Sequence, residues 1–532
     1  MAIPIIDLFA GPGGLGEGFS TLIHRNKRVF KIALSIEKDK FAHQTLTLRS
    51  FYRQFSKDKI PNDYYDVLQG NMSTQKLFEK WPKEAKLAKE EAWRAKLGYD
   101  QESAKPKEVD RMIKKALKGS KNWVLIGGPP CQAYSVVGRS RRKDKILDPE
   151  KDERVDLYRQ YLRILAVHNP TVFVMENVKG MLSAKMKESP VFKRILHDLK
   201  DPVSEYKLEN PEDSRKMTCP GYKIYSLVER SRGGDLYEDP VFNQEDFIIR
   251  CEDYGIPQTR HRVILLGIRK NLDIEPDIIE KHEYVPISMV LDGLPRLRSG
   301  LSKIENNDDN WKRVISQITE KLFFKEMDKS VAERIEKVVQ NIKLPQKKSG
   351  EEFIYASVSS KHKPDWYLDN KIKGVCNHVS RGHMESDLYR YMFVSSFGKE
   401  YKKSPKLQDF PQKLLPNHQN VGEALKNKKF ADRFRVQLEN EPAKTITSHI
   451  SKDGHYYIHP DPSQCRSLTV REAARIQTFP DNYFFCGPRT SQYHQVGNAV
   501  PPLLAYKISK IVREVFRGIR NEGIPNQVKQ EV

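Results

Sequence analysis

Short apolar runs recur along the first half of the chain and are separated by longer stretches of mixed polarity. Each run is rich in β-branched or aromatic residues and spans only four to seven positions, which is typical of strands in a buried sheet. The predicted strands cover residues 3–9, 30–36, 65–68, 123–127, 171–175 and 263–268. This pattern predicts an α/β fold with a mainly parallel sheet.

A glycine-rich segment follows the first predicted strand. Residues 10–19 read Ala-Gly-Pro-Gly-Gly-Leu-Gly-Glu-Gly-Phe, which predicts a loop that leads into a helix. Gly11, Gly13 and Gly16 match the pattern GxGxxG, a weak motif on its own. Glycines let the backbone approach a bound nucleotide closely, so this strand end is a candidate cofactor site.

Two polar residues follow the next predicted strands. Glu37 ends the second strand, where its carboxylate can accept both hydrogen bonds of a ribose diol, and an NAD site would look similar. Asn71 follows the strand predicted at 65–68, where its amide can bond an adenine edge. For either residue alone, an ordinary surface turn is an equally good interpretation.

The most informative stretch is residues 128–132, Gly-Pro-Pro-Cys-Gln, at the end of an apolar run. The glycine and the prolines predict a stiff exit from the strand, so that the thiol of Cys131 can face a ligand. We interpret Cys131 as a nucleophile. The alternative is that it is a buried small hydrophobe, as most free cysteines are.

Glu176 directly follows the strand predicted at 171–175. In a parallel sheet this places Glu176 at the same edge as Cys131. A buried carboxyl there can be held protonated and act as an acid towards a ring nitrogen. A helix N-cap or an ion-pair glutamate is the alternative interpretation.

Residues 258–262, Gln-Thr-Arg-His-Arg, open the strand predicted at 263–268. The period of two directs Gln258, Arg260 and Arg262 to one face. Two arginines on one face need partners, which can be a carbonyl or phosphate in an active site, or the acidic residues of a salt-bridged sheet surface.

The last apolar segment predicts an amphipathic helix after residues 495–502, Gln-Val-Gly-Asn-Ala-Val-Pro-Pro, because proline suits a first helical turn. Its apolar side consists of Leu504, Ile508, Ile511 and Val515. A face of this kind must be buried, so we expect the helix to return to the first domain.

Composition favours a polyanionic partner. The chain has 532 residues, 38% of them hydrophobic, which is enough for a large core and at least two domains. Its formal net charge of +22 favours nucleic acid, since Lys and Arg neutralise phosphates and release counterions. A lysine-rich surface that serves solubility alone is the alternative.

The cysteines and the N-terminus indicate the cellular compartment. Six cysteines are widely spaced and form no CxxC pair, which argues against a disulfide framework or a structural zinc site. No signal peptide or membrane span is recognisable. We therefore expect a cytoplasmic protein in a reducing compartment.

Together these segments resemble the DNA cytosine-5 methyltransferases of bacterial restriction-modification systems. Five motifs appear in the family's order: residues 7–19, the Pro-Cys-Gln of 130–132, the Glu-Asn-Val of 176–178, the Gln-x-Arg-x-Arg of 258–262 and the Gly-Asn-Ala-Val-Pro of 497–501. The resemblance covers residues 1–296 and about 441–520. It implies a Rossmann-like S-adenosylmethionine-dependent domain with a mainly parallel sheet, and a smaller target-recognition domain.

The resemblance implies a domain order. The catalytic domain spans 1–296, with charged insertions at about 76–120 and 200–245, the first of which predicts a charged surface helix. The small domain spans 297–490, with a target-recognition region at about 297–440. Residues 491–520 return to the catalytic domain and 521–532 form a tail.

Two segments of the small domain carry their own expectations. Residues 377–383 either read base edges or form the internal polar network of a folded loop. Residues 466–475 predict a capped helix that organises this domain.

The resemblance implies S-adenosylmethionine as the methyl donor and no metal. The cofactor-binding residues it implies are Phe9, Gly11, Gly13, Gly14, Glu37, Asn71, Pro130, Asn498 and Val500. Its catalytic residues are Cys131, Glu176, Arg260 and Arg262. Cys131 adds to C6 of cytosine, helped by the charge of Arg260 or Arg262, while Glu176 bonds N3 and Arg262 holds O2.

The implied partner is double-stranded DNA with the target base flipped out. The implied DNA contacts are Ser135, Arg139, Arg141, Arg142 and Gln258, the first four in a basic loop that closes over the base. A cognate restriction endonuclease encoded alongside is the implied functional partner, and a monomer is expected.

Three other functions remain open at this point. An RNA cytosine-5 methyltransferase shares much of this chemistry. A noncatalytic DNA-binding protein could use the same scaffold, although the set of Cys131, Glu176 and Arg262 speaks against it. An NAD-dependent dehydrogenase is disfavoured by Pro12 within the glycine loop and by the lack of an acid/base pair on later strands.

Overall fold

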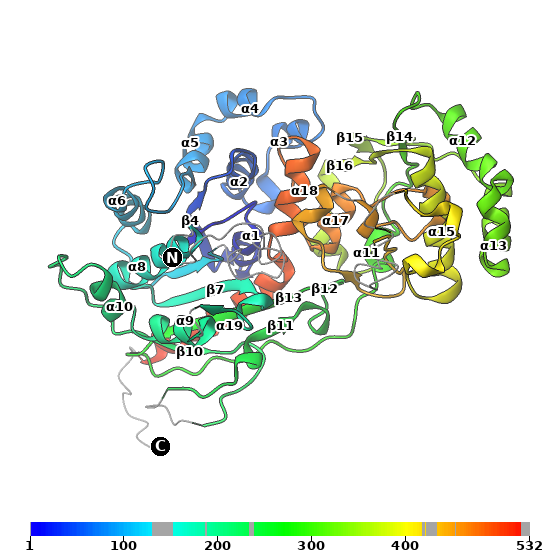
Figure 1. The fold of residues 1–532 in the computed structure, drawn as a ribbon. Helices are drawn as coiled ribbons and strands as arrows, with labels where there is room; N and C mark the ends of the chain where they lie inside the picture. The colour runs from blue at the N-terminus through cyan, green and yellow to red at the C-terminus, as the bar shows by residue number, and fades with distance from the viewer. Residues whose placement is uncertain are drawn as a thin grey trace, which may run out of the picture.

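The computed structural model describes residues 2–129, 153–186, 189–233, 239–417, 421, 433–452 and 454–522. Two lobes lie side by side in Figure 1. The first lobe is built on a central sheet, and the second lobe comprises residues from about 285 to 500.

The central sheet of the first lobe has eight strands within the described residues, in the order β10-β13-β7-β6-β1-β4-β5, with β11 paired to β13. Its strands are β1 Ile3–Leu8, β4 Phe30–Glu37, β5 Ala92–Arg94, β6 Val124–Gly127, β7 Val172–Val178, β10 Tyr222–Tyr225, β11 Ile248–Arg250 and β13 His261–Arg269. The five strands from β7 to β5 are parallel to one another, and β13 is antiparallel to β7. The predicted α/β fold with a mainly parallel sheet is confirmed.

The strand predicted at 65–68 is wrong. Those residues belong to helix α3, Asn62–Leu68. Tyr64, Tyr65 and Leu68 are buried in a cluster with Phe51, so the apolar run serves a helix face. A four-residue apolar run cannot distinguish a strand from a buried helical turn, and tertiary packing decided between them.

Both segments expected as insertions complete the sheet. Residues 76–120 do not form one charged surface helix, because β5 lies within them and pairs with β4 at one edge. Residues 200–245 contain β10, which pairs with β13 at the other edge.

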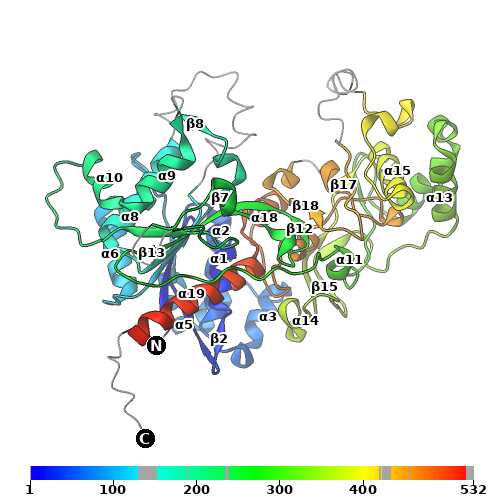
Figure 2. The ribbon, with the colours of Figure 1, turned by 90° about the horizontal axis from the view of Figure 1, so that it is seen from below.

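Helices cover both faces of the sheet. They are α1 Gly14–Ser20, α2 Lys40–Arg53, α4 Thr74–Lys80, α5 Pro82–Glu91, α6 Pro106–Leu117, α8 Glu153–His168, α9 Val191–Lys200, α10 Pro202–Glu209 and α19 Pro502–Glu522. On one face α1 and α19 pack side by side, as Figure 2 shows. On the other face α6, α8 and α9 share a second core with the sheet. The apolar side of α19, expected to return to this domain, is buried there.

The second lobe is mainly helical. Its helices are α11 Ser288–Leu291, α12 Asp308–Ser316, α13 Lys329–Gln340, α14 Pro364–Tyr367, α15 Glu385–Tyr401, α17 Val470–Ile476 and α18 Arg489–Asn498. Its strand pairs are β15 Gly350–Tyr355 with β16 Gly374–Val379, and β14 Gly300–Leu301 with β17 Gly382–His383. A strand pair between β12 Gln258–Thr259 and β18 Ala443–Lys444 joins it to the first lobe. In the first lobe, short antiparallel strand pairs also form between β2 Ile23–His24 and β3 Lys27–Arg28, and between β8 Lys185–Met186 and β9 Ser189–Pro190.

The structure bears on both local expectations for the second lobe, the capped helix at 466–475 and the role of residues 377–383. Helix α17 begins with a capping box in which Thr469 and Glu472 bond each other's backbone N–H, as the predicted capped helix requires. Asn377 and His378 are buried in β16, and His378 lies 2.9 Å from the hydroxyl of Thr469. The segment therefore contributes to an internal polar network.

None of the helices in the described part of the chain combines the length and the apolar character that crossing a membrane requires.

Candidate active site

The glycine loop connects β1 to α1 through backbone with positive φ angles. Phe9, Gly11 and Gly13 have φ values of 55°, 57° and 92°. The φ of Gly13 favours glycine, and a Cβ atom there would lie 2.8 Å from a methyl group of Leu46 and 3.0 Å from the hydroxyl of Tyr483. At Gly11 it would meet no described atom within 4 Å. The loop is thus clamped at Gly13 and borders open space at Gly11.

Glu37 stands beside that open space at the end of β4. Its carboxylate accepts hydrogen bonds from the backbone N–H of Gly11 at 2.8 Å and of Asp39 at 2.7 Å. Burial raises the pKa of Glu37 above its usual value. Each carboxylate oxygen can accept a further hydrogen bond, so a diol can still bind here.

The segment between α18 and α19 closes the other side of the loop. A Cβ atom at Gly14 would lie 2.2 Å from the carbonyl oxygen of Val500. Asn498 is exposed at the end of α18, two residues before Val500. The structure therefore brings Val500 to the start of α1.

Asn71 has a different environment from the one predicted. It follows α3, so it does not stand at a strand end, and its exposed amide donates to Gln69 at 3.0 Å and to Tyr355 of β15 at 3.4 Å. The geometry gives the predicted adenine contact no support.

Asp7 was missed by the sequence reasoning. It lies in β1, is 1% exposed, and neither carboxylate oxygen has a hydrogen-bond donor among the described residues. Burial, opposed by Arg53, raises the pKa of Asp7 to about 8. A Cβ atom at Gly16 would lie 3.1 Å from Oδ2, which places the carboxyl under α1. The sequence signal that could have revealed Asp7 is its charged side chain within an otherwise apolar predicted strand.

Glu176 and Arg262 form the polar centre at the carboxyl end of β7. Because β13 runs antiparallel to β7, Arg262 pairs with Val178 and its side chain reaches Glu176. Nε of Arg262 lies 2.8 Å from Oε1 of Glu176, and both side chains are 13% exposed. No acceptor in the described structure is aligned for a hydrogen bond with this N–H. The pair is close but incompletely hydrogen-bonded.

The backbone that leads to Cys131 passes beside Glu176. A Cβ atom at Gly128 would lie 2.8 Å from Oε2 of Glu176, and Asn177 donates to the carbonyl of Pro129 at 3.4 Å. Six predicted site residues lie outside the described residues: Pro130, Cys131, Ser135, Arg139, Arg141 and Arg142.

Arg260 and Gln258 are fully buried where the lobes meet. Arg260 donates to the carbonyls of Ile446 at 2.6 Å and Gly497 at 3.2 Å. Burial and the neighbouring Arg262 lower the pKa of Arg260 to about 9. Gln258 donates to the side chain of Gln477 at 2.5 Å. The geometry favours a bracing role for both and does not support the DNA contact predicted for Gln258.

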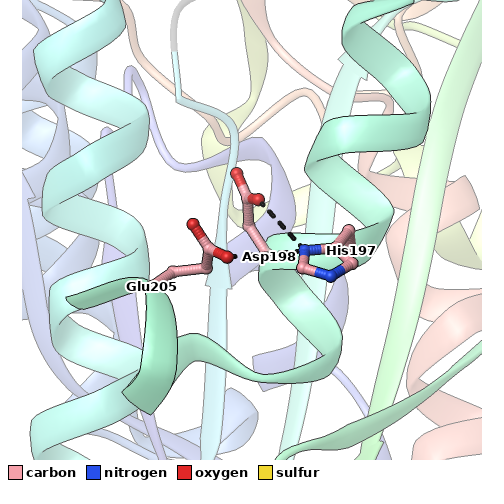
Figure 3. Close-up of side chains that lie close together, drawn as sticks. All are labelled: His197, Asp198 and Glu205. Carbon is pink, nitrogen blue, oxygen red and sulfur yellow. Dashed lines mark ion pairs between the residues drawn. The ribbon is translucent and has the colours of Figure 1, made fainter. Parts of the chain in front are cut away.

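Among the described residues, one group of side chains is arranged so that it could hold a metal ion. It consists of His197, Asp198 and Glu205, near the junction of α9 and α10. Figure 3 shows the imidazole facing both carboxylates, with Nδ1 3.8 Å from Asp198 and 3.4 Å from Glu205. The imidazole is 76% exposed, and exposed acidic groups gather in this way in many proteins without a metal ion.

Comparison with known proteins identifies the family. The family model described as C-5 cytosine-specific DNA methylase matches residues 83–209 and 242–514. Type II methyltransferase M.Bpa9945I of Bacillus paralicheniformis is 32% identical over 97% of this chain and 99% of its own. Type II methyltransferase M.DdeI of Desulfomicrobium norvegicum is 25% identical over 97% of this chain and 89% of its own.

A third relative is named for its reaction. DNA (cytosine-5-)-methyltransferase M.ApeKI of Aeropyrum pernix is 26% identical over 77% of this chain and 85% of its own. The family model covers well over half of the chain, and the 32% identical relative matches nearly all of it. The chain therefore belongs to the C-5 cytosine-specific DNA methylases.

Proposed function

We propose that the protein is a sequence-specific DNA methyltransferase that acts through a covalent bond between Cys131 and C6 of a flipped-out cytosine. The observation that carries the proposal is the Glu176–Arg262 pair, in which Glu176 lies beside the backbone leading to Cys131. The pair stands at the sheet edge formed by the carboxyl ends of β7, β6 and β1, and β1 leads into the glycine loop.

The residues around the glycine loop fit S-adenosylmethionine. The open space at Gly11 admits a ligand to the backbone, and Glu37 offers acceptors for its ribose hydroxyls. Gly14 and Val500, which meet at the start of α1, are expected to form the wall of this cradle together with Phe9, which precedes the loop. When bound, S-adenosylmethionine supplies an electrophilic methyl group.

Glu176 and Arg262 suit the polar edge of cytosine. A base that enters the site offers its O2 to the N–H groups of Arg262, whose Nε has no aligned acceptor among the described residues. Glu176 then bonds the ring at N3. Both contacts strengthen as negative charge develops on the ring, which is how they lower the barrier.

The chemical step begins at Cys131. Its thiolate adds to C6, the C5–C6 electron pair forms a C4–C5 double bond, and the C4–N3 pair moves to N3, which takes the proton of the Glu176 carboxyl to give an enamine. C5 takes the methyl group, and the electrons of the broken carbon–sulfur bond stay on the donor's sulfur, which leaves as a neutral thioether. A base then removes the C5 proton, N3 returns its proton to Glu176, and the sulfur–C6 bond breaks, so that the aromatic ring is restored and the thiolate is released.

The DNA contacts follow from the need to flip the base. A cytosine within a duplex cannot reach a thiol at a sheet edge, so it must leave the stack. Ser135, Arg139, Arg141 and Arg142 follow Cys131 in the sequence and are suited to contact phosphates around the extruded base. The net charge of +22 supports such a polyanionic partner.

The biological role we propose is protection of host DNA beside a cognate restriction endonuclease. Two of the relatives are named type II methyltransferases. Plasmid that carries the gene should resist cleavage by an endonuclease encoded next to it, and cleavage at the full rate would contradict this role.

The reaction is tested with unmethylated plasmid and methyl-labelled S-adenosylmethionine, with Cys131→Ala in parallel. Modified positions are then mapped by bisulfite sequencing. Label at C5 of one repeated sequence context, absent from the variant, is the expected result. Label on RNA but not on DNA would show that the substrate is RNA. No transfer to either would favour a noncatalytic DNA-binding protein.

A further inference from the structure

A hydrogen bond ties the glycine loop to the second lobe. The hydroxyl of Tyr483, in the segment after α17, donates to the carbonyl of Pro12. The tyrosine is fully buried, with its ring 4.8 Å from that of Phe479 and 5.5 Å from that of Phe485. Burial raises the pKa of Tyr483, so its hydroxyl stays protonated and remains a donor.

The fit between the tyrosine and the loop is close. The hydroxyl fills the space beside Gly13, where a Cβ atom would lie only 3.0 Å from it. Gly13 N–H donates to the carbonyl of Ala10 at 2.9 Å, so Pro12 lies within a tight turn. The tyrosine therefore fixes the orientation of the peptide that bends the chain towards α1.

A second link runs parallel to the first. The guanidinium of Arg49 in α2 donates to Glu17 of α1 at 2.9 Å and to the side chain of Asn482 at 3.0 Å. It also stacks between the rings of Tyr52 and Tyr483, at 3.9 and 4.8 Å from their centres. Helix α1 is thus linked through Arg49 to Asn482, the residue that precedes Tyr483 in the segment after α17.

The other end of this segment reaches β16. Arg471 of α17 donates to the backbone carbonyl of Tyr483 at 2.6 Å and to that of Cys376 in β16 at 3.0 Å. β16 lies within 297–440, the part of the second lobe expected to recognise the target. Two side chains, Arg471 and Tyr483, therefore connect that strand to the glycine loop.

We infer that Tyr483 is a positioning residue for the methyl donor, which holds the glycine loop in its binding conformation by anchoring Pro12 to the second lobe. The inference rests on the proposed function, since the loop is taken to bind S-adenosylmethionine. Tyr483 acts through Pro12 and Gly13 and touches no reacting atom. The second lobe thereby influences the affinity for the methyl donor, in addition to its expected role in DNA recognition.

The experiment compares Tyr483→Phe with Tyr493→Phe. Tyr493 is a matched control because it is equally buried in the same core and donates to the carbonyl of Leu468 at 2.6 Å, within the second lobe. For Tyr483→Phe we expect the dissociation constant for S-adenosylmethionine to rise about five- to tenfold, the effect of one lost buried hydrogen bond. The kcat at saturating methyl donor and the affinity for DNA should stay within about twofold of wild type.

An unchanged affinity for S-adenosylmethionine in folded Tyr483→Phe, or an equal loss in Tyr493→Phe, would overturn the positioning role. If the wild type neither binds S-adenosylmethionine nor transfers methyl groups, the proposed function fails instead.

A measurement on the wild type keeps the inference testable if Tyr483→Phe does not fold. S-adenosylmethionine should slow amide hydrogen exchange in residues 479–486 as well as in the glycine loop. Slowing confined to the glycine loop would contradict the inference.

Discussion

The carbonyl oxygen of Val500 occupies the space that a side chain on Gly14 would need. A Cβ atom there would lie 2.2 Å from this oxygen and 3.3 Å from Cβ of Ala499. Residues almost 500 positions apart in the sequence thus meet at the first turn of α1. The backbone before α19 is a wall of the proposed cofactor cradle.

Gly14→Ala should therefore damage the cradle. Because the obstacle is backbone, it cannot move aside as a flexible side chain could, and we expect destabilisation of about 1–3 kcal/mol. Affinity for S-adenosylmethionine should fall more than about tenfold as α1 shifts. Calorimetric titration and thermal unfolding measure the two effects. Gly233→Ala is the control, since a Cβ atom at Gly233 would meet no described atom within 4 Å, and equal behaviour of both variants would refute the assignment.

The Glu176→Gln variant should lose methyl transfer but still bind S-adenosylmethionine and DNA. The amide preserves the shape of the side chain but can neither pair with Arg262 nor give a proton to the ring, so kcat should fall by about 10²–10⁴-fold. The dissociation constant for S-adenosylmethionine should not change. Single-turnover transfer at saturating DNA measures this, and a kcat within threefold of wild type would remove Glu176 from the chemistry.

Asp7 predicts an unusual dependence of stability on pH. Burial raises its pKa to about 8 in the native state, whereas an unfolded aspartate titrates near about 4. Between these values the native state binds more protons than the unfolded state, so the free energy of unfolding falls as pH rises from about 4 to about 8. Asp7→Asn should flatten this slope and raise stability at pH 8. Urea unfolding at several pH values tests this, and parallel curves for both proteins would contradict it.

Glu17→Gln should destabilise the first lobe strongly. Glu17 is 4% exposed and is the ionic partner of the buried Arg49, with Arg53 3.6 Å away. Removing its charge leaves a buried guanidinium without its counterion, which costs about 3–5 kcal/mol. The exposed pair of Glu514 and Arg517 provides the control, because Glu514→Gln should cost under about 1 kcal/mol. Denaturant unfolding measures both, and similar losses would refute the role of burial.

Much of the proposed catalytic edge could be predicted because it follows local rules. The apolar runs before Gly128 and Glu176 are strands β6 and β7, and parallel pairing brings their carboxyl ends together. The run at 65–68 failed because four apolar residues suit a helix face as well as a strand. Because no strand forms there, Asn71 does not stand at the strand end where its adenine contact was expected.

Other features of the site depend on contacts between distant segments. Arg260 looked like an active-site cation, yet it binds carbonyls of Ile446 and Gly497. The bond from Tyr483 to Pro12 joins residues 471 positions apart. No pattern along the chain encodes such pairings, because they arise only when the two lobes pack.

The proposed reaction depends on a covalent bond between Cys131 and C6 of the target cytosine. Duplex DNA made with 5-fluorocytosine tests it directly, since fluorine at C5 cannot leave as a proton and the adduct cannot resolve. With S-adenosylmethionine present, we expect a denaturation-resistant complex whose mass is that of protein, DNA and one methyl group, with the DNA attached at Cys131. The covalent mechanism would be contradicted if the wild type methylated ordinary DNA but formed no such complex, or if Cys131→Ala formed it as readily.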